Sequence, residues 1–73
     1  MLKGKYVMTA RGPIIFSEMM QHDRFKDFNP TSAGFVRFND DGTVTTYGES
    51  VSLKLHPCES DHLMILASLS IFE

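Results

Sequence analysis

The sequence predicts a mainly β fold, a small antiparallel sheet or partly open barrel of about five strands with one short helix. Short runs of β-branched and aromatic residues alternate with Gly, Pro, Asn and Asp, which is typical of strands joined by tight turns. The chain has 73 residues, of which 42% are hydrophobic, so it holds enough apolar material for one thin core. We therefore expect a single small domain over residues 1–73. The alternative is an α+β arrangement with a C-terminal helix.

The first expected element is a tight hairpin. Residues 5–9, Lys-Tyr-Val-Met-Thr, read as a strand, and the Arg-Gly-Pro that follows reads as a turn. The apolar run 14–16 then returns as the second strand. Pro13 fits the start of that strand, because it has no amide to donate to a neighbour.

One short helix is expected next, over residues 18–24. Ser17 is a suitable N-cap, and the carboxylate of Glu18 favours the first helical turn through the helix dipole. Asn29-Pro30 marks the end of the segment, since a proline disfavours helical geometry in the residue before it.

A second hairpin carries the clearest local signal. Two β-rich runs, residues 34–38 and 43–47, flank the turn sequence Asn-Asp-Asp-Gly. A three-residue loop with a left-handed glycine at Gly42 opposes Phe35 to Tyr47 across the strands, whereas a two-residue loop opposes that phenylalanine to a glycine. Aromatic pairs across strands stabilise a sheet, so we expect the first of these registers.

The chain beyond this hairpin allows two interpretations. The apolar Val44 lies at an even position before Gly48, whereas the apolar residues Val51, Leu53 and Leu55 lie at odd positions after it. One inserted residue at Gly48-Glu49, a β-bulge, would bring both sets to one face of a continuous strand. A turn at the same place would instead make two separate strands.

The last segment, residues 62–72, fits a strand better than a helix by its apolar pattern. Its odd positions are uniformly apolar, while at helical spacing the apolar residues point all round. Length and composition favour a helix, as do Pro57, Glu59 and Asp61, which resemble a helix start. We expect a strand and keep the helix as the alternative.

Bulk properties narrow the functional classes. Nine acidic and seven basic residues give a net charge of −2, which opposes tight binding to phosphate backbones. Residues 1–38 hold six basic and three acidic residues, and residues 39–73 hold one basic and six acidic residues, so the halves carry +3 and −5. The longest apolar run, residues 63–72, is too short to span a membrane. One cysteine and no signal-like start suggest a reducing, cytoplasmic setting.

Residues 34–38, Gly-Phe-Val-Arg-Phe, resemble the second half of the ribonucleoprotein octamer of RNA-recognition-motif domains. The first three positions of that octamer do not match, since Thr31, Ser32 and Ala33 replace its basic residue, glycine and aromatic. The resemblance implies aromatic rings on a sheet face that stack on unpaired bases. Weak single-stranded nucleic-acid binding is therefore the alternative function, and tight binding is not expected. Its candidate contacts are Tyr6, Phe35, Arg37 and Tyr47.

The polar stretch 56–62 contains side chains of the types that bind metal ions or act as nucleophiles in catalysis. His56, Cys58 and His62 would need a further partner such as His22 to hold zinc or copper, and their spacing matches no zinc signature. A Cys58–His62 nucleophile pair lacks a visible third group. We expect no metal, no cofactor and no catalytic residue, and hence a protein that is not an enzyme.

The leading hypothesis is a small, self-associating interaction or assembly module. One sheet in so short a chain can cover one face of the last segment but has little material for the second. A homodimer would cover the remaining apolar residues and the sheet edge beside them. The candidate interface residues are Leu63, Met64, Leu66 and Phe72.

Overall fold

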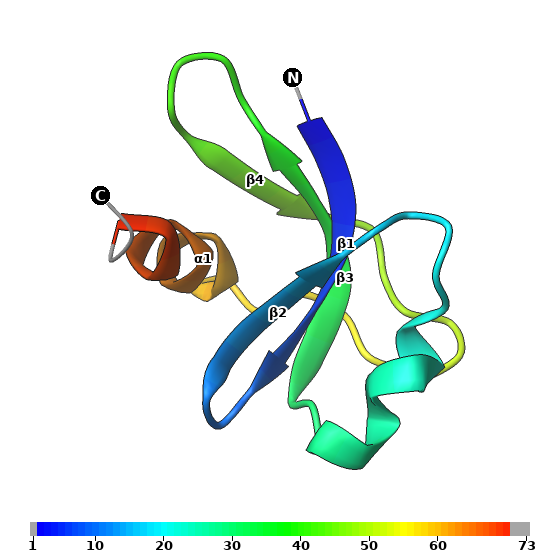
Figure 1. The fold of residues 1–73 in the computed structure, drawn as a ribbon. Helices are drawn as coiled ribbons and strands as arrows, with labels where there is room; N and C mark the ends of the chain where they lie inside the picture. The colour runs from blue at the N-terminus through cyan, green and yellow to red at the C-terminus, as the bar shows by residue number, and fades with distance from the viewer. Residues whose placement is uncertain (1, 71–73) are drawn as a thin grey trace.

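The fold is a four-stranded antiparallel sheet with a helix on each side (Figure 1). The computed structural model describes residues 2–70, with side chains up to residue 68. The prediction of a mainly β fold is confirmed, with four strands in one open sheet rather than about five. The strands, in the spatial order β2-β1-β3-β4, are β1 (Leu2–Thr9), β2 (Gly12–Phe16), β3 (Ser32–Phe38) and β4 (Val44–Tyr47). The helices are the 3₁₀ helix η1 (His22–Phe28) and the α-helix α1 (Asp61–Ser70).

The first hairpin forms as predicted. Strands β1 and β2 pair so that Thr9 opposes Gly12 and Met8 opposes Pro13. Gly12 has a φ of +114°, which only glycine adopts readily, and this lets the chain reverse within two residues. Strand β2 lies at the edge of the sheet, where a proline without an amide is tolerated.

The second hairpin also has the predicted register. Phe38 opposes Val44, and Phe35 opposes Tyr47 with the two rings stacked 5.6 Å apart. Gly42 has a φ of +90° and closes the three-residue loop. A pair of short-range signals, the turn glycine and the aromatic pair, therefore determines this part of the sheet.

The predicted strand over residues 62–72 is wrong, because residues 61–70 form α1. The Ser60 carbonyl accepts hydrogen bonds from the amides of Leu63 and Met64, so the helix starts where the alternative interpretation placed its signals. The apolar residues of this segment fit a strand pattern because the helix is apolar on its outer side as well as on its buried side, which hides the helical period. No helix in the described part of the chain has the length and apolar content to cross a membrane.

The continuous bulged strand expected after Gly48 is not formed. Gly48 has a φ of +70° and turns the chain away from β4, as the turn alternative expected, but the second strand of that alternative is not formed either. The following segment forms an isolated bridge between Ser50 and Leu55 rather than another strand of the sheet. A side chain at position 48 would place its Cβ 2.7 Å from the Phe35 ring, so close packing as well as conformation requires glycine there.

The helix expected over residues 18–24 begins four residues later, as η1. The Ser17 hydroxyl accepts a hydrogen bond from the Met19 amide, and its carbonyl accepts one from Met20, so Ser17 closes an isolated turn instead of capping a helix. Asn29, with a φ of +53°, ends η1 at the place that Asn29-Pro30 predicted.

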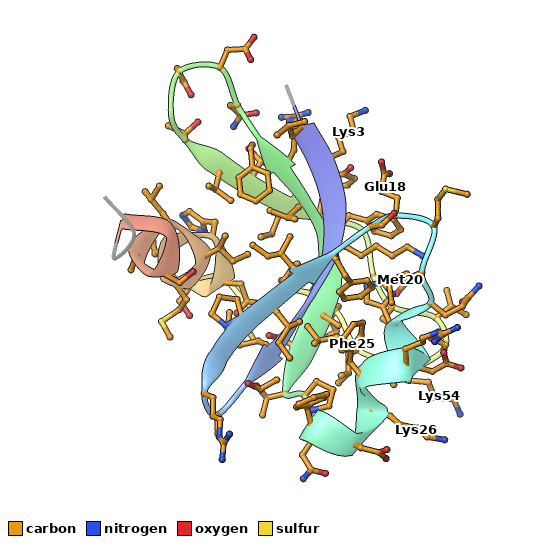
Figure 2. The ribbon with its side chains drawn as sticks, in the orientation of Figure 1. Lys3, Glu18, Met20, Phe25, Lys26 and Lys54 are labelled. Carbon is orange, nitrogen blue, oxygen red and sulfur yellow. The ribbon has the colours of Figure 1, made fainter. Side chains whose placement is uncertain are left out.

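The two sides of the sheet have different partners. On one side, which we call the helix face, Tyr6, Val36 and Val44 pack with Ile65 of α1 to form the core. On the other side, the aromatic face, Phe16 packs on Phe25 of η1 with ring centroids 4.4 Å apart. Figure 1 shows α1 and η1 on opposite sides of the strands, and Figure 2 shows Phe25 on the η1 side.

Candidate functional site

Helix α1 exposes apolar side chains on the side turned away from the sheet. Leu63, Met64 and Leu66, which we call the helix outer face, are 58%, 50% and 40% exposed, whereas Ile65 is fully buried. All three are predicted interface residues, and the fourth, Phe72, lies outside the described residues. Because 100° separates successive residues of a helix, these three occupy one arc opposite Ile65. They form a contiguous apolar surface of the kind that marks an interaction site.

A buried carboxylate holds α1 against the sheet. Asp61, 2% exposed, accepts three hydrogen bonds at one oxygen, Oδ2. The donors are the Tyr6 hydroxyl at 2.5 Å, the Ser32 hydroxyl at 2.7 Å and the Cys58 amide at 2.9 Å. Charge-assisted bonds of this kind are strong and directional, so they determine where the helix starts and how it lies on the strands.

The same contacts keep the Tyr6 phenol neutral. Its burial raises the pKa of Tyr6 well above the usual value near 10, and the hydrogen bond to the Asp61 carboxylate raises it further. A phenol in this state keeps its proton, donates a hydrogen bond to Asp61 and is not available to a ligand. The sequence marks Asp61 as part of a helix start and as one of the acids of the polar stretch 56–62, but it does not reveal these contacts, because the two hydroxyl partners lie 29 and 55 residues away along the chain.

The four candidate nucleic-acid contacts do not share a face. Phe35, Arg37 and Tyr47 lie together on the aromatic face, since Phe35 opposes Tyr47 and all three occupy positions of the same parity on β3 and β4. Tyr6 lies on the helix face and is fully buried. The structure therefore brings three of these side chains together and separates the fourth.

The rings on the aromatic face are partly covered by the protein itself. The Lys5 ammonium lies 5.5 Å from the centre of the Phe35 ring and donates a hydrogen bond to the Met20 carbonyl. His22 meets the same ring edge-on at 5.8 Å. Tyr47, 37% exposed, is the more accessible partner of the stacked pair.

Cations gather on the same face. Strand register places Lys3 directly opposite Arg37, and Lys5 lies two residues further along β1. Arg37 donates from Nε to the Asn39 side chain, which holds its guanidinium close to the strand. Like charges directly opposite each other destabilise a sheet slightly, so a contribution to fold stability does not account for the placement of Lys3 opposite Arg37.

The histidines and the cysteine of the polar loop do not converge with His22. His22 is buried between Phe16 and Phe35, and its Nε2 lies 2.8 Å from the Gly34 carbonyl, to which it donates. His56 and Cys58 are exposed. Within residues 2–70 no three His, Cys, Asp or Glu side chains are placed to share a metal ion.

A depression of about 290 Å³ lies beside the first hairpin turn. It is lined by Arg11 and its neighbours on one side and by Asp27, Phe28 and Asn29 at the end of η1 on the other. Its two charged groups have opposite signs and Phe28 is 56% exposed. This lining shows no set of groups arranged for acid–base or nucleophilic chemistry.

Comparison with protein-family models, curated proteins and solved structures found no match. Two surfaces of the molecule are therefore the candidates for function. They are the apolar helix outer face and the aromatic face with its cations.

Proposed function

We propose that the protein is a non-catalytic interaction module that forms a homodimer through the helix outer face. The observation that carries this proposal is the exposure of Leu63, Met64 and Leu66 on one side of α1. Apolar side chains on a helix face in water favour association, because contact removes apolar surface from solvent. The carboxylate and hydroxyl groups that gather at Asp61, Tyr6 and Ser32 are buried and bonded to one another, so an interaction role accounts for more of the structure than catalysis.

A second copy of the chain is the partner that this surface suits best. The outer residues of α1 carry no charge, and the acidic group of its first turn, Asp61, is buried and bonded. Two such helices related by a two-fold axis bring no like charges together. A charged partner would gain nothing from this face and would lose hydration on binding it.

Leu66→Lys tests the proposal. We expect this variant to fold normally and to raise the dimer dissociation constant ~100-fold, because a lysine charge would have to lose its water at the interface. Sedimentation equilibrium over a wide range of concentration measures the change. Met19→Lys is the matched control, since Met19 is 93% exposed in the turn before η1 and lies off the proposed interface.

Two outcomes would contradict the proposal. One is a wild-type protein that stays monomeric at the highest concentrations. The other is a dimer that Leu66→Lys and Met19→Lys affect equally, which would place the interface elsewhere.

The alternative function, weak binding of single-stranded nucleic acid, is supported by Phe35, Arg37 and Tyr47 without Tyr6. Salt separates the two candidates. Phosphate contacts weaken steeply as salt rises, whereas apolar dimerisation does not.

A cytoplasmic location remains part of the proposal, and the exposed, free thiol of Cys58 is compatible with a reducing environment.

A further inference from the structure

We infer that the free edge of β4 pairs with β4 of a second copy, so that the dimer has one continuous eight-stranded sheet. This inference rests on the proposed self-association and adds its geometry. The helix outer face consists of three side chains, whereas a stable interface buries about 800 Å² on each partner. A dimer therefore needs a second surface next to α1, and β4 is a strand against which α1 packs.

The outer edge of β4 has unpaired backbone groups. The Asn39 amide bonds to the Thr43 carbonyl at 2.9 Å, which makes these two residues a hydrogen-bonded pair at the hairpin loop. Hydrogen-bonded and non-hydrogen-bonded pairs alternate along an antiparallel ladder. Val44 and Thr46 therefore direct their N–H and C=O groups away from β3, and within residues 2–70 these groups have no partner in another loop or strand.

This edge also lacks the usual protection against pairing. Natural edge strands carry proline, lysine or a bulge that blocks a neighbour. The opposite edge of the sheet, β2, contains Pro13. Strand β4, with the sequence Val-Thr-Thr-Tyr, has no proline and no charge.

A second copy of β4 supplies a hydrogen-bond partner for each outward N–H and C=O group of Val44 and Thr46. If two β4 strands run antiparallel with Thr45 opposite its symmetry mate, Val44 of each copy pairs with Thr46 of the other. The outward N–H and C=O of both residues then have partners, whereas a shift of the register in either direction leaves part of the set unpaired. The two-fold axis is perpendicular to the sheet, so both α1 helices lie on the same side of it. Met64 and Leu66 lie about 100° to either side of the buried Ile65, so one of these two flanks of α1 faces the partner helix across the seam, while Leu63 points away from the sheet.

Charge swaps at Thr45 test this register. The Thr45→Lys variant and the Thr45→Glu variant each place like charges opposite each other on the axis, and we expect each to raise its homodimer dissociation constant at least ~10-fold. An equimolar mixture of the two should recover a 1:1 heterodimer, because the charges are then opposite. Thr31→Lys, at an exposed position before β3, is the control and should leave the dimer unchanged.

A second measurement reports on the backbone directly. The amides of Val44 and Thr46 should exchange slowly with solvent at concentrations where the dimer forms and rapidly after dilution. Suppose that Leu66→Lys weakens the dimer, but the Thr45 variants keep the wild-type dissociation constant and the two amides exchange rapidly at every concentration. The pairing inference then fails and the proposed function stands. A monomeric wild-type protein would overturn both.

Discussion

At the residue scale, Asp61 makes the contacts that connect the most distant parts of the chain. Its Oδ2 joins the start of α1 to β1 through Tyr6, to β3 through Ser32 and to the preceding loop through the Cys58 amide. Burying a carboxylate is unfavourable unless donors replace its water, and three donors do so here. The orientation of the helix outer face therefore depends on a polar contact on the opposite side of α1.

Asp61→Ala should lower the free energy of unfolding by about 3 kcal/mol, because it leaves two buried hydroxyls and an amide without an acceptor. Urea denaturation followed by circular dichroism measures this loss. Ser68→Ala is the control, since it removes a half-buried hydroxyl that bonds only to the Ile65 carbonyl within the same helix, and it should change stability by about 0.5 kcal/mol or less. A loss of unfolding free energy below about 1 kcal/mol for Asp61→Ala would show that the hydrogen bonds of Asp61 do not anchor the helix.

Tyr6 gives the fold a dependence on alkaline pH. Because the folded state raises the pKa of Tyr6, the unfolded chain ionises this phenol first, near pH 10. The stabilising contribution is fully present below that pH and is lost as the pH rises above it. We expect the stability of the wild-type protein to fall between about pH 10 and 11.5 and that of Tyr6→Phe to fall less over the same range. Parallel curves for the two proteins would contradict this assignment.

At the element scale, the sequence predicts the hairpins well because their signals are short-range. Gly12 and Gly42 mark the two turns, and the pairing of Phe35 with Tyr47 selects the register of the second hairpin. These features lie within a few residues of the structure they determine. Both hairpins therefore form where the sequence analysis expected them.

Helix α1 could not be identified in the same way. Its apolar residues surround the helix because one side packs on the sheet and the other, Leu63 with Met64 and Leu66, is exposed. A pattern that reflects two apolar faces has no clear helical period. That some apolar residues of this segment stay exposed is expected from the sequence, since a short chain with this much apolar content cannot bury all of it. Tyr6 lies on the face opposite Phe35, Arg37 and Tyr47, which the sequence does not reveal because only the pairing of β1 with β3 determines its face.

Gly42→Val tests the turn that sets the second hairpin. Gly42 has a φ of +90°, and a Cβ there would meet nothing within 4 Å, so the penalty comes from backbone conformation alone. We expect a loss of stability on the order of 1 kcal/mol or more. Nuclear Overhauser contacts should still link Phe38 with Val44. Contacts of Phe38 with Thr45 instead would show a different register.

At the scale of the whole molecule, the sheet separates two chemically different surfaces. Helix α1 covers one side and presents apolar residues to solvent, while the other side carries stacked rings with Lys3, Lys5 and Arg37. The acidic residues Asp41 and Glu49 lie just beyond the two ends of β4. In the paired dimer, Asp41 of one copy and Glu49 of the other lie beyond the same end of the antiparallel seam, so added salt should screen the repulsion between these like charges and strengthen association.

The mass of the wild-type protein in solution shows whether the chain forms a homodimer. Sedimentation equilibrium from low micromolar to millimolar concentration, at low and at high salt, should show a reversible monomer–dimer equilibrium that shifts toward the dimer as salt rises. A chain that sediments as a folded monomer of 8.3 kDa throughout this range would contradict the account.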